Sequence, residues 1–138
     1  MEINNIVKII LIALGGIIGF FYGSWSPLLN LLLATVVFDY LTGFIASFME
    51  GRSGRGNGLN SSIGFVGIAR KVCIFIIVAV AHIADKSIGS DVIMTATIFF
   101  YLANELLSIL ENAGRIGLPI PGALSTAIEV LKRKGEAK

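Results

Sequence analysis

Hydrophobic residues occur in four long runs, which are separated by short polar or glycine-rich segments. The runs cover residues 6–22, 28–49, 72–84 and 92–110. Because an α-helix rises about 1.5 Å per residue, about 20 residues are needed to cross the hydrocarbon core of a bilayer. The second and fourth runs are long enough, and the first is adequate. The pattern predicts an all-α membrane protein with about four transmembrane helices, of which the first, second and fourth cover about 6–22, 28–49 and 92–110.

The third run is short for a transmembrane helix. It can be lengthened backward through Arg70 and Lys71, whose aliphatic stems allow their charged ends to reach the headgroups. We therefore predict a third span at about 70–86, with Arg70 and Lys71 at the cytoplasmic interface. Ser61 and Ser62 mark an alternative start, for a helix that lies partly in the interface before it turns inward.

The first run also has features of a cleaved signal peptide, because Lys8 precedes an apolar stretch. No convincing small-x-small cleavage pair follows it, however, and residues 23–27 have the composition of a tight turn between membrane helices. A first transmembrane helix is the preferred interpretation, and a signal peptide is the alternative.

The composition indicates that lipid is the solvent of this chain. Of the 138 residues, 55% are hydrophobic and only 14% are charged, with a mean hydropathy of +0.85. A soluble domain of this size would need more charge to cover its surface. The net charge of +2 is too small to indicate a nucleic-acid partner. The lone cysteine, Cys73, excludes an internal disulfide and is expected to be a small buried apolar side chain.

The distribution of basic residues predicts the orientation. If both termini and the loop after the second span lie on one side, that side holds all lysines and arginines except Lys86. Only an even number of spans gives this asymmetry, and the positive-inside rule assigns the basic side to the cytoplasm. Both termini are therefore predicted to be cytoplasmic.

Two segments lie outside the predicted spans. Residues 51–62 contain four glycines and are expected to form a flexible cytoplasmic loop. We predict a transmembrane domain over 1–111 and a cytoplasmic linker with a basic tail over 112–138. Within the tail, residues 123–134 place Leu124, Ile128 and Leu131 on one helical face. This pattern favours a short amphipathic helix on the anionic inner leaflet, with a plain solvated tail as the alternative.

Polar side chains within the spans are the candidates for function, because a carboxylate at the centre of a membrane helix costs about 2.5–3.5 kcal/mol. Small or polar residues form a stripe in the second span: Thr35, Asp39, Gly43 and Ser47. The fourth span has a broader polar face: Thr97, Tyr101, Asn104, Glu105, Ser108, Glu111 and Asn112. Either these stripes are helix contacts, with Asp39 neutral or paired with a cation, or they line water in an assembly.

The first span contains Gly15, Gly19 and Gly23 at GxxxG spacing. Such glycines allow close approach of two helices, either between subunits or within one subunit. His82 is expected to be a packed or interface histidine. No nucleophile with a base at recognisable spacing, ligand cluster or phosphate-binding loop is present, so we predict no enzyme, metal or cofactor.

Three separated motifs carry a family resemblance. They are residues 38–43 (FDYLTG), residues 61–62 with 67–71 (SS and GIARK), and residues 104–112 with 117–121 (NELLSILEN and GLPIP). In order and spacing, over about Val37 to Leu131, the chain resembles the toxin-secretion/phage-lysis holin family, whose members are often described with three spans.

This resemblance implies a multi-pass protein of the bacterial cytoplasmic membrane, without substrate or cofactor. It implies that copies associate into homo-oligomers in the bilayer and open pores or lesions that release an endolysin or toxin, without necessary direct contact. The alternatives are a small proton-coupled four-helix transporter, in which Asp39 would be the essential carboxylate, and an antiholin or membrane scaffold.

Overall fold

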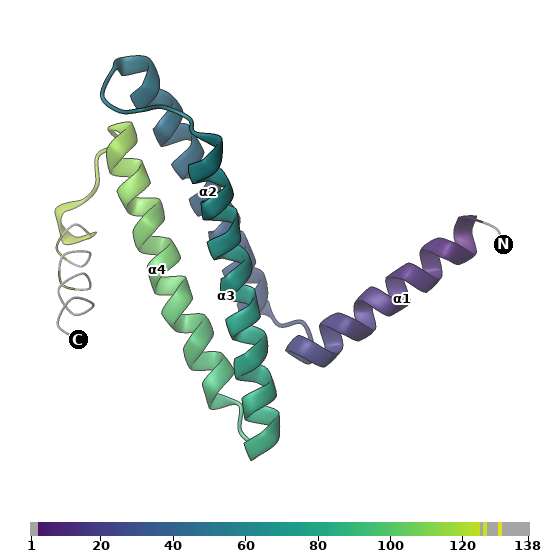
Figure 1. Cartoon of the computed structure of the whole chain (residues 1–138). Helices are drawn as coiled ribbons and strands as arrows, with labels where there is room; N and C mark the ends of the chain where they lie inside the picture. The colour runs from purple at the N-terminus through teal and green to yellow at the C-terminus, as the bar shows by residue number, and fades with distance from the viewer. Residues whose placement is uncertain (1–2, 125, 127–129, 131–138) are drawn as a thin grey trace.

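The computed structural model describes residues 3–124, 126 and 130. Four long helices, α1 (Ile3–Tyr22), α2 (Pro27–Ser53), α3 (Ser61–Ile88) and α4 (Val92–Ile116), account for most of these residues (Figure 1). By length and composition, each of the four can cross a membrane. The chain is therefore an all-α, multi-pass membrane protein, as predicted.

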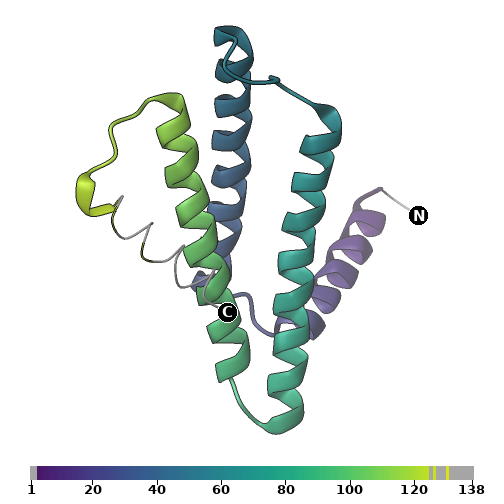
Figure 2. The ribbon, with the colours of Figure 1, turned by 60° about the vertical axis from the view of Figure 1, so that its left-hand side comes forward.

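Helices α2, α3 and α4 run up, down and up beside one another (Figures 1 and 2). Helix α4 packs extensively against α2 and also against α3, whereas α2 and α3 barely contact each other. A small apolar core holds the three helices together, with Leu29, Leu32, Val36, Ile74, Val78, Ile98 and Leu102 as its buried members.

Helix α1 extends away from the other three helices (Figure 1). None of its residues is buried. Its carboxyl-terminal end contacts α3, where the hydroxyl of Tyr22 donates a hydrogen bond to the backbone oxygen of Phe75 at 2.9 Å. Gly23 ends the helix with a φ of 68°, and its N–H bonds the oxygen of Gly19 at 3.0 Å.

Local sequence signals set the helix ends. Ser26 caps α2 by accepting from the N–H of Leu29, and Pro27 occupies the first turn, where a missing N–H costs nothing. Asn60 caps α3 by accepting from the N–H of Ser62. Left-handed glycines end α2, α3 and α4: Gly54, Gly89 and Gly117.

Several helices extend beyond the predicted spans. The third span is part of one continuous helix that begins at Ser61, because Asn60 caps it and the stretch before Arg70 contains no proline to interrupt it. The connection between α2 and α3 is correspondingly shorter than the predicted loop. Helix α4 continues past residue 110 to Ile116, so the proposed division at 111–112 falls inside a helix. The predicted tail helix, residues 123–134, lies mostly outside the described residues.

Candidate functional site

Three charged side chains meet between the helices. Asp39, Lys71 and Glu105 lie near the middle of α2, α3 and α4, respectively. The Nζ atom of Lys71 lies 2.5 Å from Oδ2 of Asp39 and also forms an ion pair with Oε2 of Glu105. We call these residues the ion triad, because one ammonium bridges two carboxylates from different helices.

The ion triad is shielded from its surroundings. Asp39 is 7% exposed and Glu105 is 5% exposed, while 18% of the Lys71 side chain remains accessible. Removing charges from water is costly unless they are paired and hydrogen-bonded, so Lys71 offsets the desolvation of both carboxylates. With two carboxylates and one ammonium, the cluster keeps one excess formal negative charge when all three groups are ionised.

Asn112 extends the polar cluster along α4. Its Nδ2 atom donates to Oδ1 of Asp39 at 3.0 Å, to the backbone oxygen of Asp39 at 3.3 Å and to Oγ1 of Thr42 at 3.2 Å. Gly43 makes room for this side chain, since a Cβ atom there would lie 3.3 Å from Nδ2 of Asn112. The small residue and the amide together allow close packing of α2 on α4.

Arg115 continues the polar contacts to the end of α2. Its guanidinium donates to both carboxylate oxygens of Glu50, at 2.9 Å and 2.7 Å, and to Oδ1 of Asn112 at 3.0 Å. A bidentate ion pair of this kind fixes the orientation of the guanidinium relative to the carboxylate and also pairs their charges. A continuous chain of polar contacts therefore runs from the ion triad to the α2–α3 connection.

A buried carboxylate stabilises the opposite end of the bundle. Asp85, near the end of α3, is 2% exposed and accepts hydrogen bonds from the N–H groups of Ile93 at 3.0 Å and Met94 at 2.7 Å. It thereby satisfies two free donors at the start of α4 and complements the helix dipole. One turn earlier, Nε2 of His82 is buried without a hydrogen-bond partner in the described part of the chain.

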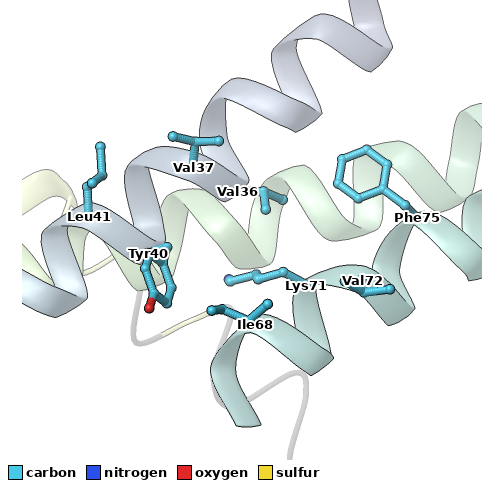
Figure 3. A pocket seen from close by; sticks show the side chains of 8 residues that line it. All are labelled: Val36, Val37, Tyr40, Leu41, Ile68, Lys71, Val72 and Phe75. Atoms are coloured by element: carbon cyan, nitrogen blue, oxygen red, sulfur yellow. The ribbon is translucent and has the colours of Figure 1, made fainter. Parts of the chain in front are cut away.

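An apolar groove lies between α2 and α3, where these helices diverge (Figure 3). It encloses about 260 Å³. Its lining consists of Val36, Val37, Tyr40, Leu41, Ile68, Lys71, Val72 and Phe75. Lys71 contributes its aliphatic stem to this groove and directs its ammonium to the two carboxylates. We refer to it below as the α2–α3 groove.

Packing of the helices buries some residues of the predicted polar stripes and leaves others exposed. Buried members are Thr35, Asp39, Glu105 and Asn112, whereas Asn104 and Glu111 are exposed and Ser108 is half-buried. The side chain of Thr35 bonds its own helix, at the backbone oxygens of Leu31 and Leu32. The ion triad agrees with the interpretation in which Asp39 is paired with a cation.

Three other expectations need correction. Lys71 was assigned to the cytoplasmic interface with Arg70, but only Arg70 is exposed; Lys71 turns inward because two buried carboxylates attract it. Gly23 belongs to the turn after α1 and not to the helix itself, and it packs closely against His82 of α3. Cys73 is exposed on α3 instead of buried.

The sequence does contain a signal that Lys71 is paired inside the bundle. A continuous helix from Ser61 places this lysine among membrane-spanning residues, where an unpaired charge is costly and a partner is expected. Asp85 lies within α3, seven residues before α4 begins, and no local pattern distinguishes it from Asp91, the carboxylate directly before that helix. The contacts of Thr42 and Arg115 depend on the packing of α2 on α4, and no local pattern indicates them.

Taken together, the fold and the site define a small multi-pass membrane protein in which Asp39, Lys71 and Glu105 pair within one chain. Its sequence matches the bacteriophage holin family over residues 16–133. The chain therefore belongs to the bacteriophage holin family, a non-enzymatic family of membrane proteins, and this membership supports a holin role.

Relatives occur in bacteria and in a phage. The chain is 45% identical over 125 residues to an uncharacterized protein of Halalkalibacterium halodurans, with 86% of this chain and 88% of the relative aligned. It is 41% identical over 135 residues to an uncharacterized protein of Listeria innocua, covering 97% and 91%. It is also 32% identical over 111 residues to a probable holin of Bacillus phage phi105, covering 80% and 78%. No solved structure matches this chain.

Proposed function

We propose that this protein is a holin that oligomerises in the bacterial cytoplasmic membrane and opens lesions that release an endolysin or toxin. The observation that carries this proposal is the match of residues 16–133 to the bacteriophage holin family. Because Asp39, Lys71 and Glu105 pair with one another between the helices, they do not line a water-filled path through one subunit. A lesion must then form between copies of the chain.

The outer surface of the helices supports association within a bilayer. Large hydrophobic side chains are exposed along all four helices, and α1 has no buried residue. In lipid, helices associate through close packing and not through a hydrophobic driving force, so an unpacked helix retains the capacity to bind another. The partners in this proposal are the lipid bilayer and further copies of the chain.

The proposed orientation places both termini in the cytoplasm. Arg52, Arg55 and Arg115 lie at the end of the bundle that holds the α2–α3 connection, whereas Lys86 lies near the opposite end. This asymmetry supports a cytoplasmic position for the α2–α3 connection under the positive-inside rule. Lys71 no longer contributes to the asymmetry, because it is paired inside the bundle.

The structure offers less support for a proton-coupled transporter. Both carboxylate oxygens of Asp39 are engaged, one by Lys71 and the other by Asn112. A carboxylate that must bind and release protons during transport would have to break these contacts in each cycle. An antiholin with the same architecture is distinguished by experiment.

The test is induced expression in a Gram-positive host that also makes an endolysin lacking an export signal. We expect a sudden loss of membrane potential, followed by lysis only in cells that contain the endolysin. High membrane levels of the protein with intact potential and viability would contradict the proposal. Delayed lysis on co-expression with an active holin would identify an antiholin instead.

A further inference from the structure

Helix α1 lacks a partner along most of its length. Tyr22 is bonded to Phe75 at its carboxyl-terminal end, and the following Gly23 is pressed against His82, since a Cβ atom on Gly23 would lie 2.9 Å from Cε1 of His82. These contacts hold α1 so that it points away from its own bundle (Figures 1 and 2). The remainder of the helix is exposed.

The α2–α3 groove offers an apolar surface that matches the apolar surface of α1. It runs between two helices that diverge, and its lining is apolar except for Tyr40 and Lys71 (Figure 3). Phe75, the residue that anchors α1 through its backbone oxygen, also lines the groove. The groove therefore lies beside the carboxyl-terminal end of α1.

We propose that α1 of a second copy of this chain occupies the α2–α3 groove. The inference rests on the proposed function, because it names the contact through which the holin assembles. One face of α1 carries Lys8, Ile12, Gly15 and Gly19, since residues three and four apart share a helix face. A Cβ atom on Gly15 or Gly19 would meet nothing within 4 Å, so this face is open to close approach by another helix.

In the proposed contact, Lys8 of α1 and Lys71 of the α2–α3 groove lie at similar depths in the bilayer. Gly23 lies beside His82, which gives α1 and α3 a common level, and copies in one bilayer share that level. When α1 stands upright, Lys8 lies fifteen residues before Gly23 and so about 22 Å above it, at about 1.5 Å per residue. Lys71 lies eleven residues before His82, or about 16 Å above it by the same rise. About one helical turn separates the two lysines, a distance that a lysine stem can span.

The charge of α1 is complementary to that of the ion triad beside the α2–α3 groove. The ion triad has two carboxylates and one ammonium, and Lys8 is the sole charged residue of α1. Placing Lys8 at the level of the ion triad brings a second cation near the two carboxylates. The excess negative charge inside the membrane is thereby balanced.

This contact has a consequence for assembly. Each copy donates α1 from one surface and receives α1 on another, so the interface is heterologous. Repetition of such a contact produces a ring if the rotation closes and an open chain if it does not. Lesions of variable size are compatible with this geometry.

The test uses disulfide cross-linking in membranes. Two forms of the full chain, distinguished by tags of different size and both carrying Cys73→Ser, receive Ile12→Cys and Val72→Cys, respectively. Both positions are exposed in the single chain. On mild oxidation we expect a dimer of mixed size, and we expect its loss when Ile10→Cys, on the opposite face of α1, replaces Ile12→Cys.

Several outcomes would overturn the inference. One is a mixed dimer no more abundant than in the Ile10→Cys control, and another is dimers only between two Ile12→Cys chains. A third is a link only within one chain, in a variant that carries both Ile12→Cys and Val72→Cys. Membrane potential, measured in the same cells, separates the two proposals. Depolarisation and lysis without the mixed dimer reject this contact and leave the holin function standing, whereas a mixed dimer without depolarisation supports the contact and rejects the lesion.

Discussion

The Nζ atom of Lys71 on α3 lies 2.5 Å from Oδ2 of Asp39 on α2, although these two helices barely contact each other elsewhere. The ion pair therefore bridges the floor of an otherwise open groove. Glu105 joins the same ammonium from α4, so one lysine connects all three helices of the bundle.

Lys71→Met should destabilise the bundle strongly. Removing the cation leaves Asp39 and Glu105 buried without their shared partner, and breaking a buried ion pair in this way costs about 3–5 kcal/mol. Thermal unfolding of the purified protein in detergent measures the effect.

A compensated variant provides the control for this prediction. Lys71→Met combined with Asp39→Asn and Glu105→Gln removes all three charges together, and we expect it to recover most of the lost stability. A Lys71→Met protein as stable as the parent would show that the ion triad does not hold the helices together.

Asn112→Leu should weaken the packing of α2 on α4. The substitution removes three donated contacts to Asp39 and Thr42 and leaves buried acceptors unsatisfied, at a cost of about 1–3 kcal/mol. Asn104→Leu, on an exposed face of the same helix, is the matched control and should change little. Equal effects of the two substitutions on unfolding would contradict the assigned role of Asn112.

Asp85→Ala should loosen the start of α4. Loss of a side-chain cap typically costs about 0.5–2 kcal/mol. Faster hydrogen exchange at the amides of Ile93 and Met94 would report the change, because Asp85 accepts from both. Asp91→Ala serves as the control, since Asp91 makes no capping bond from its side chain. Unchanged exchange in Asp85→Ala would refute the cap.

Gly23→Ala should alter the direction of α1. A left-handed conformation costs a residue with a Cβ atom about 1–2 kcal/mol, and the new methyl group would also press on His82. Spin labels at Ile10 and Ile76 should show a shifted or broadened distance distribution. Gly19→Ala, where the space is open, should leave the distribution unchanged. The same distribution in Gly23→Ala as in the parent would show that Gly23 does not fix α1.

The sequence was sufficient to predict the four spans, because hydrophobic runs of this length have few alternatives in a folded chain. It was less informative about the start of α3. Residues 61–71 contain serines, glycines and two cations, so local hydropathy underestimates a helix that Asn60 caps and that packs through its later residues. The same underestimate led Lys71 to be placed at the headgroups.

The candidate site was only half predictable. Asp39 and Glu105 stand out because carboxylates are rare in membrane helices, but their shared partner depends on how α3 is rotated against α2 and α4. Asn104 and Asn112 look equivalent in the sequence. Packing separates them, because Gly43 opens a place on α2 for Asn112 alone, while Asn104 remains exposed.

The central claim is that copies of this chain open lesions large enough for a folded protein. Reconstitution of the purified chain into anionic lipid vesicles, loaded with a small dye and a fluorescent protein of endolysin size, tests it most directly. The account predicts that both cargoes escape above a threshold ratio of protein to lipid. Retention of the fluorescent protein at every ratio, with the chain fully inserted, would contradict it.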